Sequence, residues 1–171
     1  MGDHLWPLLR LKGETEEEKK EAYSKVFVST YVRDEDGEPI VLTDWNGRRV
    51  RFSKHNAEHV LSKDTDYRFR GGHHDKPFDP GRARRILWIK EVLQATAGTI
   101  ERYGQLRNDT RGRATKRRML LVVEERYVVI LEEDQKGGGD LFFVSAFPAD
   151  RAYIEREKRK STFLESKKPQ S

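Results

Sequence analysis

Three short apolar segments between Arg111 and Phe147 constrain the fold of this chain more than any other feature. The segments 119–123, 127–131 and 141–147 are rich in β-branched and aromatic residues, and charged residues or glycines separate them. Short runs of this kind are typical of strands in an antiparallel sheet. A basic run precedes them, made of Arg111, Arg113, Lys116, Arg117 and Arg118. Cations that lead into a sheet can hold a polyanion, so the functional hypotheses begin with this stretch.

The positive charge of the chain is concentrated in its middle. Residues 44–130 carry 20 Lys+Arg against 11 Asp+Glu, an excess of 9, so the remainder carries about −4 of the total of +5. A basic region of this kind favours a nucleic acid as partner. The simpler alternative is a basic surface that only keeps the protein dissolved.

Several classes of protein are excluded by composition. The chain has no cysteine, which rules out disulfides, thiolate metal sites and a cysteine nucleophile. No apolar run reaches the roughly 18–20 residues of a membrane-spanning helix. Residues 1–10 are too short and too polar for a secretory signal. We therefore expect a cytoplasmic protein without a membrane partner.

The N-terminal half predicts a short helix, a small β-meander and a second helix. Thr15 and Glu18 form a capping box at the start of the first helix. Asn46-Gly47 indicates a hairpin with a type I′ turn, and Ser53 can cap the second helix. The expected elements are a helix over 15–24, strands at 25–33 and 40–43, and a helix over 54–62.

The C-terminal half predicts a helix that packs on a sheet. Asp79-Pro80 marks the start of this helix, and Ile86, Ile89 and Leu93 share one of its faces. The expected elements are a helix over 81–95, strands at 117–124, 127–132 and 140–146, and a closing helix over 153–159.

The chain divides into three parts. We expect an N-terminal segment with the short helix over 1–24, a single domain over 25–154, and a basic, disordered C-terminal tail over 155–171. The leucine-rich residues 1–13 either dock on a partner or pack on the domain.

Two histidines on the second helix support a zinc hypothesis. His55 and His59 match the pattern H-x-x-E-H, in which both imidazoles hold a metal and Glu58 acts as the base. The pattern needs a third ligand, and the carboxylates that follow lie in predicted strands. The adjacent pair His73-His74 cannot easily face one metal. We therefore expect no metal and no cofactor.

Metal-free cleavage of RNA is the other interpretation of His55 and His59. In this reaction the ribose 2′-OH attacks the neighbouring phosphate and a 2′,3′-cyclic phosphate forms. The reaction needs a base, an acid, and cations where negative charge develops. Histidine transfers protons near neutral pH, and arginine matches phosphate oxygens. The simpler explanation of both histidines is that they are helix-surface groups.

Ser145 is the hydroxyl group of the last apolar segment. Strand alternation places Phe143, Ser145 and Phe147 on one face and Phe142, Val144 and Ala146 on the other. If the helix over 81–95 covers the second set, Ser145 lies on an open surface between two rings that can stack on bases. The reverse orientation buries Ser145.

The segments F-S-K-H-N-A-E-H-V-L, R-R-I-L-W-I-K-E-V-L, R-R-M-L-L-V-V, Y-V-V-I-L and L-F-F-V-S-A-F follow one another in this order. This order resembles the phage-associated members of the barnase–EndoU–colicin–RelE nuclease superfamily over about residues 40–150. The resemblance implies an α+β fold, with two helices packed on a four-stranded antiparallel sheet. The N-terminal hairpin and the short N-terminal helix are additions to it. The resemblance also implies a metal-independent ribonuclease, deployed as a toxin or a phage-borne effector.

The resemblance assigns roles to individual positions. The family's histidine after the first strands matches His59, with His55 as the alternate, and its hydroxyl residue on the last strand matches Ser145. Its basic residue at the entry to the sheet matches Arg118 or Arg117. The expected catalytic residues are His59, His55, Arg118 and Ser145. The expected RNA-binding residues are Arg84, Arg85, Arg113, Lys116 and Arg117.

Two partners follow from this hypothesis. One is RNA, such as tRNA, and the other is an inhibitor or immunity protein. The alternative function is a non-catalytic nucleic-acid-binding or phage accessory module with the same fold.

Overall fold

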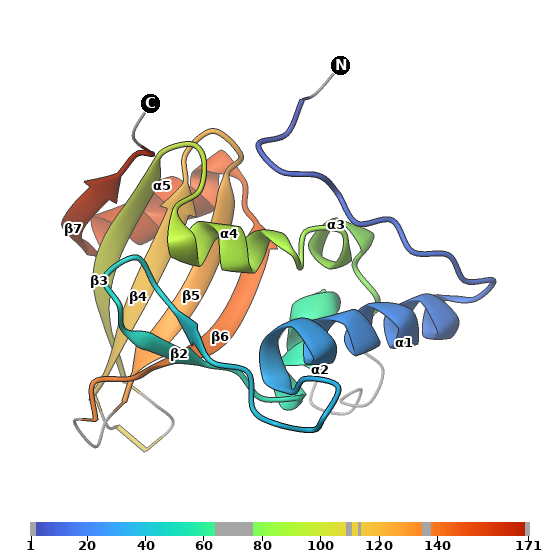
Figure 1. Ribbon diagram of the computed structural model, residues 1–171. Coiled ribbons are helices and arrows are strands. Elements are labelled where there is room, and N and C mark those ends of the chain that lie inside the picture. The colour runs from blue at the N-terminus through green and yellow to red at the C-terminus, as the bar shows by residue number, and fades with distance from the viewer. Residues whose placement is uncertain (1–2, 64–76, 109–110, 113, 135–137, 170–171) are drawn as a thin grey trace.

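The structure, a computed structural model, describes residues 3–63, 77–108, 111–112, 114–134 and 138–169. These residues form an α+β fold in which a curled, seven-stranded sheet has helices on both faces (Figure 1). The strand order is β1-β2-β6-β5-β4-β3-β7, with β2 and β6 parallel and all other neighbours antiparallel. The strands are β1 Leu42–Thr43, β2 Arg49–Arg51, β3 Ile100–Asn108, β4 Ala114–Val122, β5 Tyr127–Glu133, β6 Leu141–Pro148 and β7 Thr162–Lys167.

The predicted sheet of four antiparallel strands with two helices is wrong. The sheet has seven strands of mixed direction, and the described residues contain five α-helices. The helices are α1 Glu16–Phe27, α2 His55–Leu61, α3 Pro80–Ala83, α4 Trp88–Gln94 and α5 Arg151–Arg159. The prediction failed at the sheet edges, where sequence signals are weakest, and at β3, a nine-residue strand between β4 and β7 for which no strand was predicted. Strand β7, which we expected to be part of a disordered tail, has exposed or half-buried side chains throughout.

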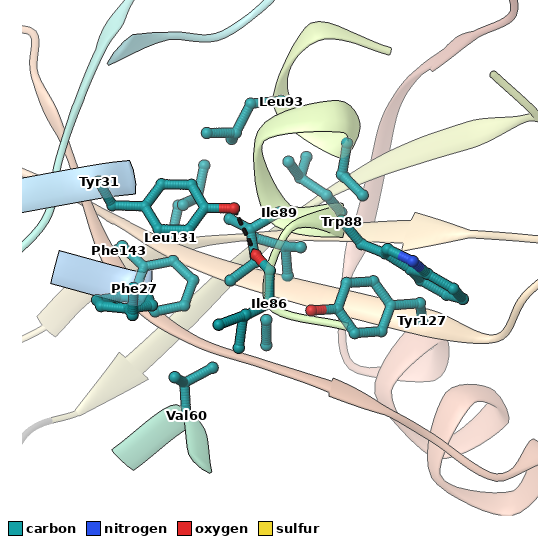
Figure 2. Packing of buried hydrophobic residues seen from close by; sticks show 14 of the residues in the cluster. Phe27, Tyr31, Val60, Ile86, Trp88, Ile89, Leu93, Tyr127, Leu131 and Phe143 are labelled. Atoms are coloured by element: carbon teal, nitrogen blue, oxygen red, sulfur yellow. Dashed lines mark hydrogen bonds between the residues drawn. The ribbon is translucent and has the colours of Figure 1, made fainter. Parts of the chain in front are cut away.

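The two faces of the sheet carry separate cores. The larger core lies inside the curl, beneath α1, α2 and α4, and includes Phe27, Tyr31 and Trp88. Figure 2 shows Tyr31 reaching across this core, where its hydroxyl donates a hydrogen bond to the carbonyl of Ile86. The smaller core lies beneath α5 and includes Ile154. Each large apolar side chain that is fully buried contributes roughly 1.5–3 kcal/mol, so the inner core dominates the stability of the fold.

The segment 25–33, predicted as a strand, is helical. Helix α1 runs to Phe27 and continues as a π-helix over Val28–Val32. Tyr23, Phe27 and Tyr31 recur every four residues and are all buried, so they form one helix face. The predicted cap of α1 is confirmed, because the Thr15 side chain accepts a hydrogen bond from the Glu18 amide at 3.1 Å.

The predicted hairpin between β1 and β2 is present, but its turn is not type I′. Gly47 has a φ of +83°, whereas Asn46 is not in the left-handed region. The buried side chain of Asp44 organises the turn, since its Oδ1 accepts from the amides of Asn46 and Arg48, both at 2.9 Å. Asp44, two residues before Asn46, therefore decides the turn type.

The helix predicted over 81–95 is divided into α3 and α4. Its predicted start is confirmed, because the Asp79 side chain accepts a hydrogen bond from the amide of Arg82 and Pro80 is the first helical residue. Helices α2 and α5 also occur where they were expected.

The leucine-rich N-terminal segment packs on the domain. Trp6 is 7% exposed, and its indole donates to Thr96 Oγ1 at 2.9 Å. The indole of Trp88 donates to the carbonyl of Pro7 at 2.9 Å. Of the two alternatives for residues 1–13, the structure therefore shows packing.

The curl brings the two edges of the sheet together. Trp45, in the β1–β2 turn, donates from its indole to Glu165 Oε1 of β7 at 2.6 Å. Arg102 of β3 lies 3.6 Å from Glu165 Oε2, and its guanidinium carbon is 5.9 Å from the Trp45 ring centroid. These contacts join strands from opposite ends of the strand order.

Candidate nucleic-acid interface

Helix α2 carries both candidate histidines and lies next to β6. Ala57, Val60 and Leu61 bury one side of the helix in the inner core, which leaves His55 exposed and His59 half-buried. Asn56 ties the helix to the strand, because its Nδ2 donates to the carbonyl of Phe143 at 3.2 Å. The helix has no side-chain cap from Ser53, whose amide instead donates to Asn56 Oδ1 at 2.7 Å.

The zinc hypothesis gains no third ligand. Within the part of the chain that the structure describes, no three His, Cys, Asp or Glu side chains are grouped closely enough to hold a metal. His73-His74 lies outside the described residues. Glu58, the base of that hypothesis, forms an ion pair with Lys20 of α1 at 2.7 Å. Its carboxylate therefore links two helices.

Helix α3 and the residues after it bring arginines next to α2. The amide of Asp79 donates to the carbonyl of Leu61, and the amide of Lys63 donates to that of Pro77, both at 2.8 Å. These bonds join the end of α2 to the start of α3. The arginines that follow are Arg82, Arg84 and Arg85.

These three arginines have different surroundings. Arg82 is 6% exposed, lies 3.6 Å from Asp79, and its guanidinium carbon is 4.9 Å from the Phe147 ring centroid. Arg85 donates to the carbonyl of Gly81 at 2.7 Å and stacks on a tryptophan ring. Arg84 is half-buried, and no hydrogen bond or ion pair holds its guanidinium among the described residues. Of the two predicted RNA-binding arginines here, Arg84 is therefore the available one and Arg85 is engaged.

Two buried tyrosines hold the backbone of this arginine-bearing segment. The hydroxyl of Tyr31 donates to the carbonyl of Ile86, and that of Tyr127 donates to the carbonyl of Arg85 at 3.2 Å. Burial raises the pKa of Tyr31 and of Tyr127 well above the ordinary value for tyrosine. Both hydroxyls therefore remain protonated donors at neutral pH.

The basic run at the entry to β4 is divided between the two faces of the sheet. Arg118 lies opposite Leu131 of the inner core and pairs with Glu133 of β5 at 2.5 Å. Arg117 lies on the other face and pairs with Glu132 at 3.5 Å. Carboxylates of the neighbouring strand therefore neutralise both arginines. Lys116 is exposed, and Arg113 lies outside the described residues.

Of the two alternatives for Ser145, an open surface or burial, the structure shows burial. Ser145 is 5% exposed, and it lies opposite Ile130, whose side chain packs in the smaller core. The pairing of β5 with β6 shifts between Ile130 and Leu131, which leaves Val144 as an extra residue. Because of this bulge, the side chains of β6 do not alternate strictly between the two faces of the sheet. Phe143 and Ala146, three residues apart, both pack in the inner core.

The structure brings together only part of the predicted site. The end of α2, the helix with both histidines, is hydrogen-bonded to the start of the segment that carries Arg84 and Arg85. Arg118 is two strands away from β6 and faces the opposite side of the sheet from Ser145.

Two cations near Arg84 were missed in the sequence. Arg10 and Lys19 line a small pocket together with Arg84. Arg10 stands among leucines and Lys19 inside an acidic capping segment, so neither belongs to a basic run. Their convergence depends on how the N-terminal segment packs, which no local pattern reports.

A scan against models of protein families, a search of curated proteins and a search of solved structures each found no match to this chain. Among the described residues, no helix combines the length and the apolar character that crossing a bilayer requires.

Proposed function

We propose that this protein binds RNA and cleaves it without a metal, using the histidines of α2 for proton transfer. The observation that carries the proposal is the junction of α2 and α3, where the helix that carries both histidines ends next to the start of the arginine-bearing segment. Proton transfer at neutral pH and a cation for phosphate are the two requirements of 2′-OH attack. The resemblance to phage-associated nucleases supports the same chemistry.

In the proposed reaction, one histidine removes the proton of the ribose 2′-OH. The 2′-oxygen forms a bond to phosphorus, and the bond from phosphorus to the 5′-oxygen breaks. The other histidine gives its proton to the leaving 5′-oxygen. His59 and His55 are the candidates for these two roles, and Arg84 is the cation that binds a phosphate of the same RNA. The products are a 2′,3′-cyclic phosphate and a 5′-hydroxyl end.

A non-catalytic RNA-binding module is the second candidate. It is favoured by the ion pair of Arg118 with Glu133 and by the burial of Ser145, which leave fewer groups for catalysis. Such a module keeps the salt-sensitive binding of RNA and forms no cyclic phosphate.

The test is incubation with total RNA in the presence of a chelator, followed by identification of the new ends. We expect 2′,3′-cyclic phosphate ends from the wild-type protein, and a fall of about 100-fold or more in rate for His59→Ala. His4→Asn is the matched control, because His4 pairs with Glu125 at 2.8 Å at the start of the N-terminal segment. Unchanged cleavage by His59→Ala would remove that residue from the mechanism, and no cleavage by the wild-type protein would leave the binding module.

The biological setting follows from the chemistry. We assign the protein to the cytoplasm, where its proposed substrate, RNA such as tRNA, is present. A cell that makes such a toxin or phage-borne effector needs an inhibitor or immunity protein. These assignments belong to the proposal and depend on cleavage being found.

A further inference from the structure

A small pocket lies between the N-terminal segment, the first turns of α1 and the start of α3. Its polar lining is made of three cations, Arg10, Lys19 and Arg84, and the buried rings of Tyr23 and Phe78 line it as well. The volume that water-sized spheres can occupy in it is about 60 Å³. Pockets for drug-sized ligands begin at about 300 Å³, so this one suits a single small group.

Among the described residues, no carboxylate pairs with these cations. None of the lining residues is acidic, and within the described ranges none of the three side chains forms a hydrogen bond or an ion pair. Glu18 accepts from the amide of Glu14 at 2.8 Å, and Asp79 is bound to Arg82. Three like charges around one hollow repel each other unless an anion lies between them.

The pocket is part of a fixed structure. The hydroxyl of Tyr23 donates to the carbonyl of Leu9 at 2.8 Å and accepts from the amide of Leu11 at 3.0 Å. The amide of Leu9 donates to the carbonyl of Arg84, also at 2.8 Å. The residues on both sides of Arg10 are therefore bound to α1 and to the segment after α3, so the backbone that carries Arg10 is fixed beside Arg84.

We propose that Arg10, Lys19 and Arg84 form a binding site for one phosphate group, and that the N-terminal segment serves to complete it. A guanidinium group can bind phosphate through two parallel N–H···O hydrogen bonds, and the lysine ammonium adds a compact positive charge. The rings of Tyr23 and Phe78 are 3% and 7% exposed, so they cannot stack on a base. The site therefore recognises phosphate without reading sequence.

The ligand is a phosphate group of RNA, and this identity rests on the proposed function. The affinity for an anion does not depend on cleavage, because it involves neither histidine. Free phosphate has the same chemistry, so the experiment has to separate the two sources.

The experiment uses the full chain and two probes, inorganic phosphate and a short single-stranded RNA, at several salt concentrations. Arg10→Gln and Arg84→Gln are each expected to lower the affinity for both probes by about 10-fold. For RNA, the slope of log affinity against log salt should become shallower by about 0.7 for each phosphate that the variant no longer neutralises. Lys12→Gln is the control, since Lys12 is exposed, two residues from Arg10 and outside the pocket lining. Circular dichroism confirms the fold of each variant.

Each outcome decides one part of the proposal. If RNA binds and both variants bind it as the wild type does, the phosphate site is overturned while RNA binding stands. If inorganic phosphate binds to the wild type and not to the variants, but no RNA binds, the anion site stands and the proposed function fails. An equally weakened Lys12→Gln shows a non-specific charge effect and overturns the site.

Discussion

Two groups of cations in this protein have opposite electrostatic surroundings. At the entry to the sheet, Arg117 and Arg118 each face a glutamate of β5, at 3.5 and 2.5 Å. At the N-terminal pocket, Arg10, Lys19 and Arg84 surround a hollow without any acidic lining residue. The first group is the more conspicuous in the sequence, and the second is scattered over three separate segments. A run of positive charge therefore identifies a binding surface only after its carboxylate partners are known.

The pairing of β4 with β5 explains this difference. The two strands are joined by a tight turn, so basic residues before the apolar run of β4 meet acidic residues after the apolar run of β5. Cross-strand pairs of opposite charge stabilise an antiparallel sheet, which gives Arg117 and Arg118 a structural role. Within the part of the chain that the structure describes, the pocket cations have no such carboxylate opposite them.

The largest expected effect comes from removing a carboxylate of the first group. Glu133→Ala leaves the guanidiniums of Arg118 and Arg48 without their partner. We expect the free energy of unfolding to fall by about 2 kcal/mol, below the roughly 3–5 kcal/mol of a fully buried pair because these side chains remain partly exposed. Denaturant unfolding measures this change. Glu132→Ala, whose pair with Arg117 is longer, is the control and should cost less than about 1 kcal/mol. Equal costs would mean that the two ion pairs do not differ in strength.

A smaller effect separates the two groups by function. Arg117→Gln should change RNA affinity less than about 2-fold, because Glu132 already neutralises this guanidinium. Arg84→Gln should weaken binding by about 10-fold, equivalent to about 1.4 kcal/mol. Filter binding or fluorescence anisotropy at fixed salt compares the two variants. An equal weakening in both would restore the basic run as the RNA-binding surface.

The smallest effect concerns the two buried tyrosines that bind the backbone of Arg85 and Ile86, next to Arg84, and it is a change in the free energy of unfolding at high pH. Above a pH of about 10, an unfolded tyrosine loses its proton while Tyr31 and Tyr127, whose pKa values are raised by burial, keep theirs. The free energy of unfolding should therefore fall as the pH rises beyond about 10, by up to about 1.4 kcal/mol per pH unit for each such tyrosine. Tyr31→Phe should cost about 1 kcal/mol at neutral pH and reduce this dependence.

The control is Tyr103→Phe on the outer face, where the pKa is also raised by burial. Thermal unfolding at neutral pH and at about one pH unit above the ordinary tyrosine pKa compares the variants. If only Tyr103→Phe changes the alkaline destabilisation, the tyrosines beneath the Arg84 segment do not contribute to it.

The sequence predicted the elements that have strong local signals. The capping box at Thr15, the Asp79-Pro80 helix start and the central strands were all visible, since each depends on neighbouring residues. The helical conformation of 25–33 was not visible, because its short apolar run suits a strand as well as the end of a helix. Strand β7 has no buried side chain, so its position depends on pairing with β3 and gives no hydrophobic pattern to read.

The candidate site was harder to predict than the fold. The histidines on α2 could be placed from their spacing, but the face of Ser145 depended on one extra residue in β6. The assignment of Arg118 failed to anticipate Glu133, which lies fifteen residues later on the neighbouring strand. The pocket forms where the N-terminal segment, α1 and the residues around α3 come together. The sequence of each of these segments alone does not indicate that they are in contact.

The bond between Trp45 and Glu165 has a consequence for synthesis of the protein. Its two residues are 120 positions apart, and ribosomes add about 5–20 residues per second. Trp45 is therefore incorporated roughly 6–24 seconds before Glu165. Throughout that interval the β1–β2 hairpin has no β7 beside it, so the contact that joins the two edges of the sheet forms only when almost the whole chain has been made.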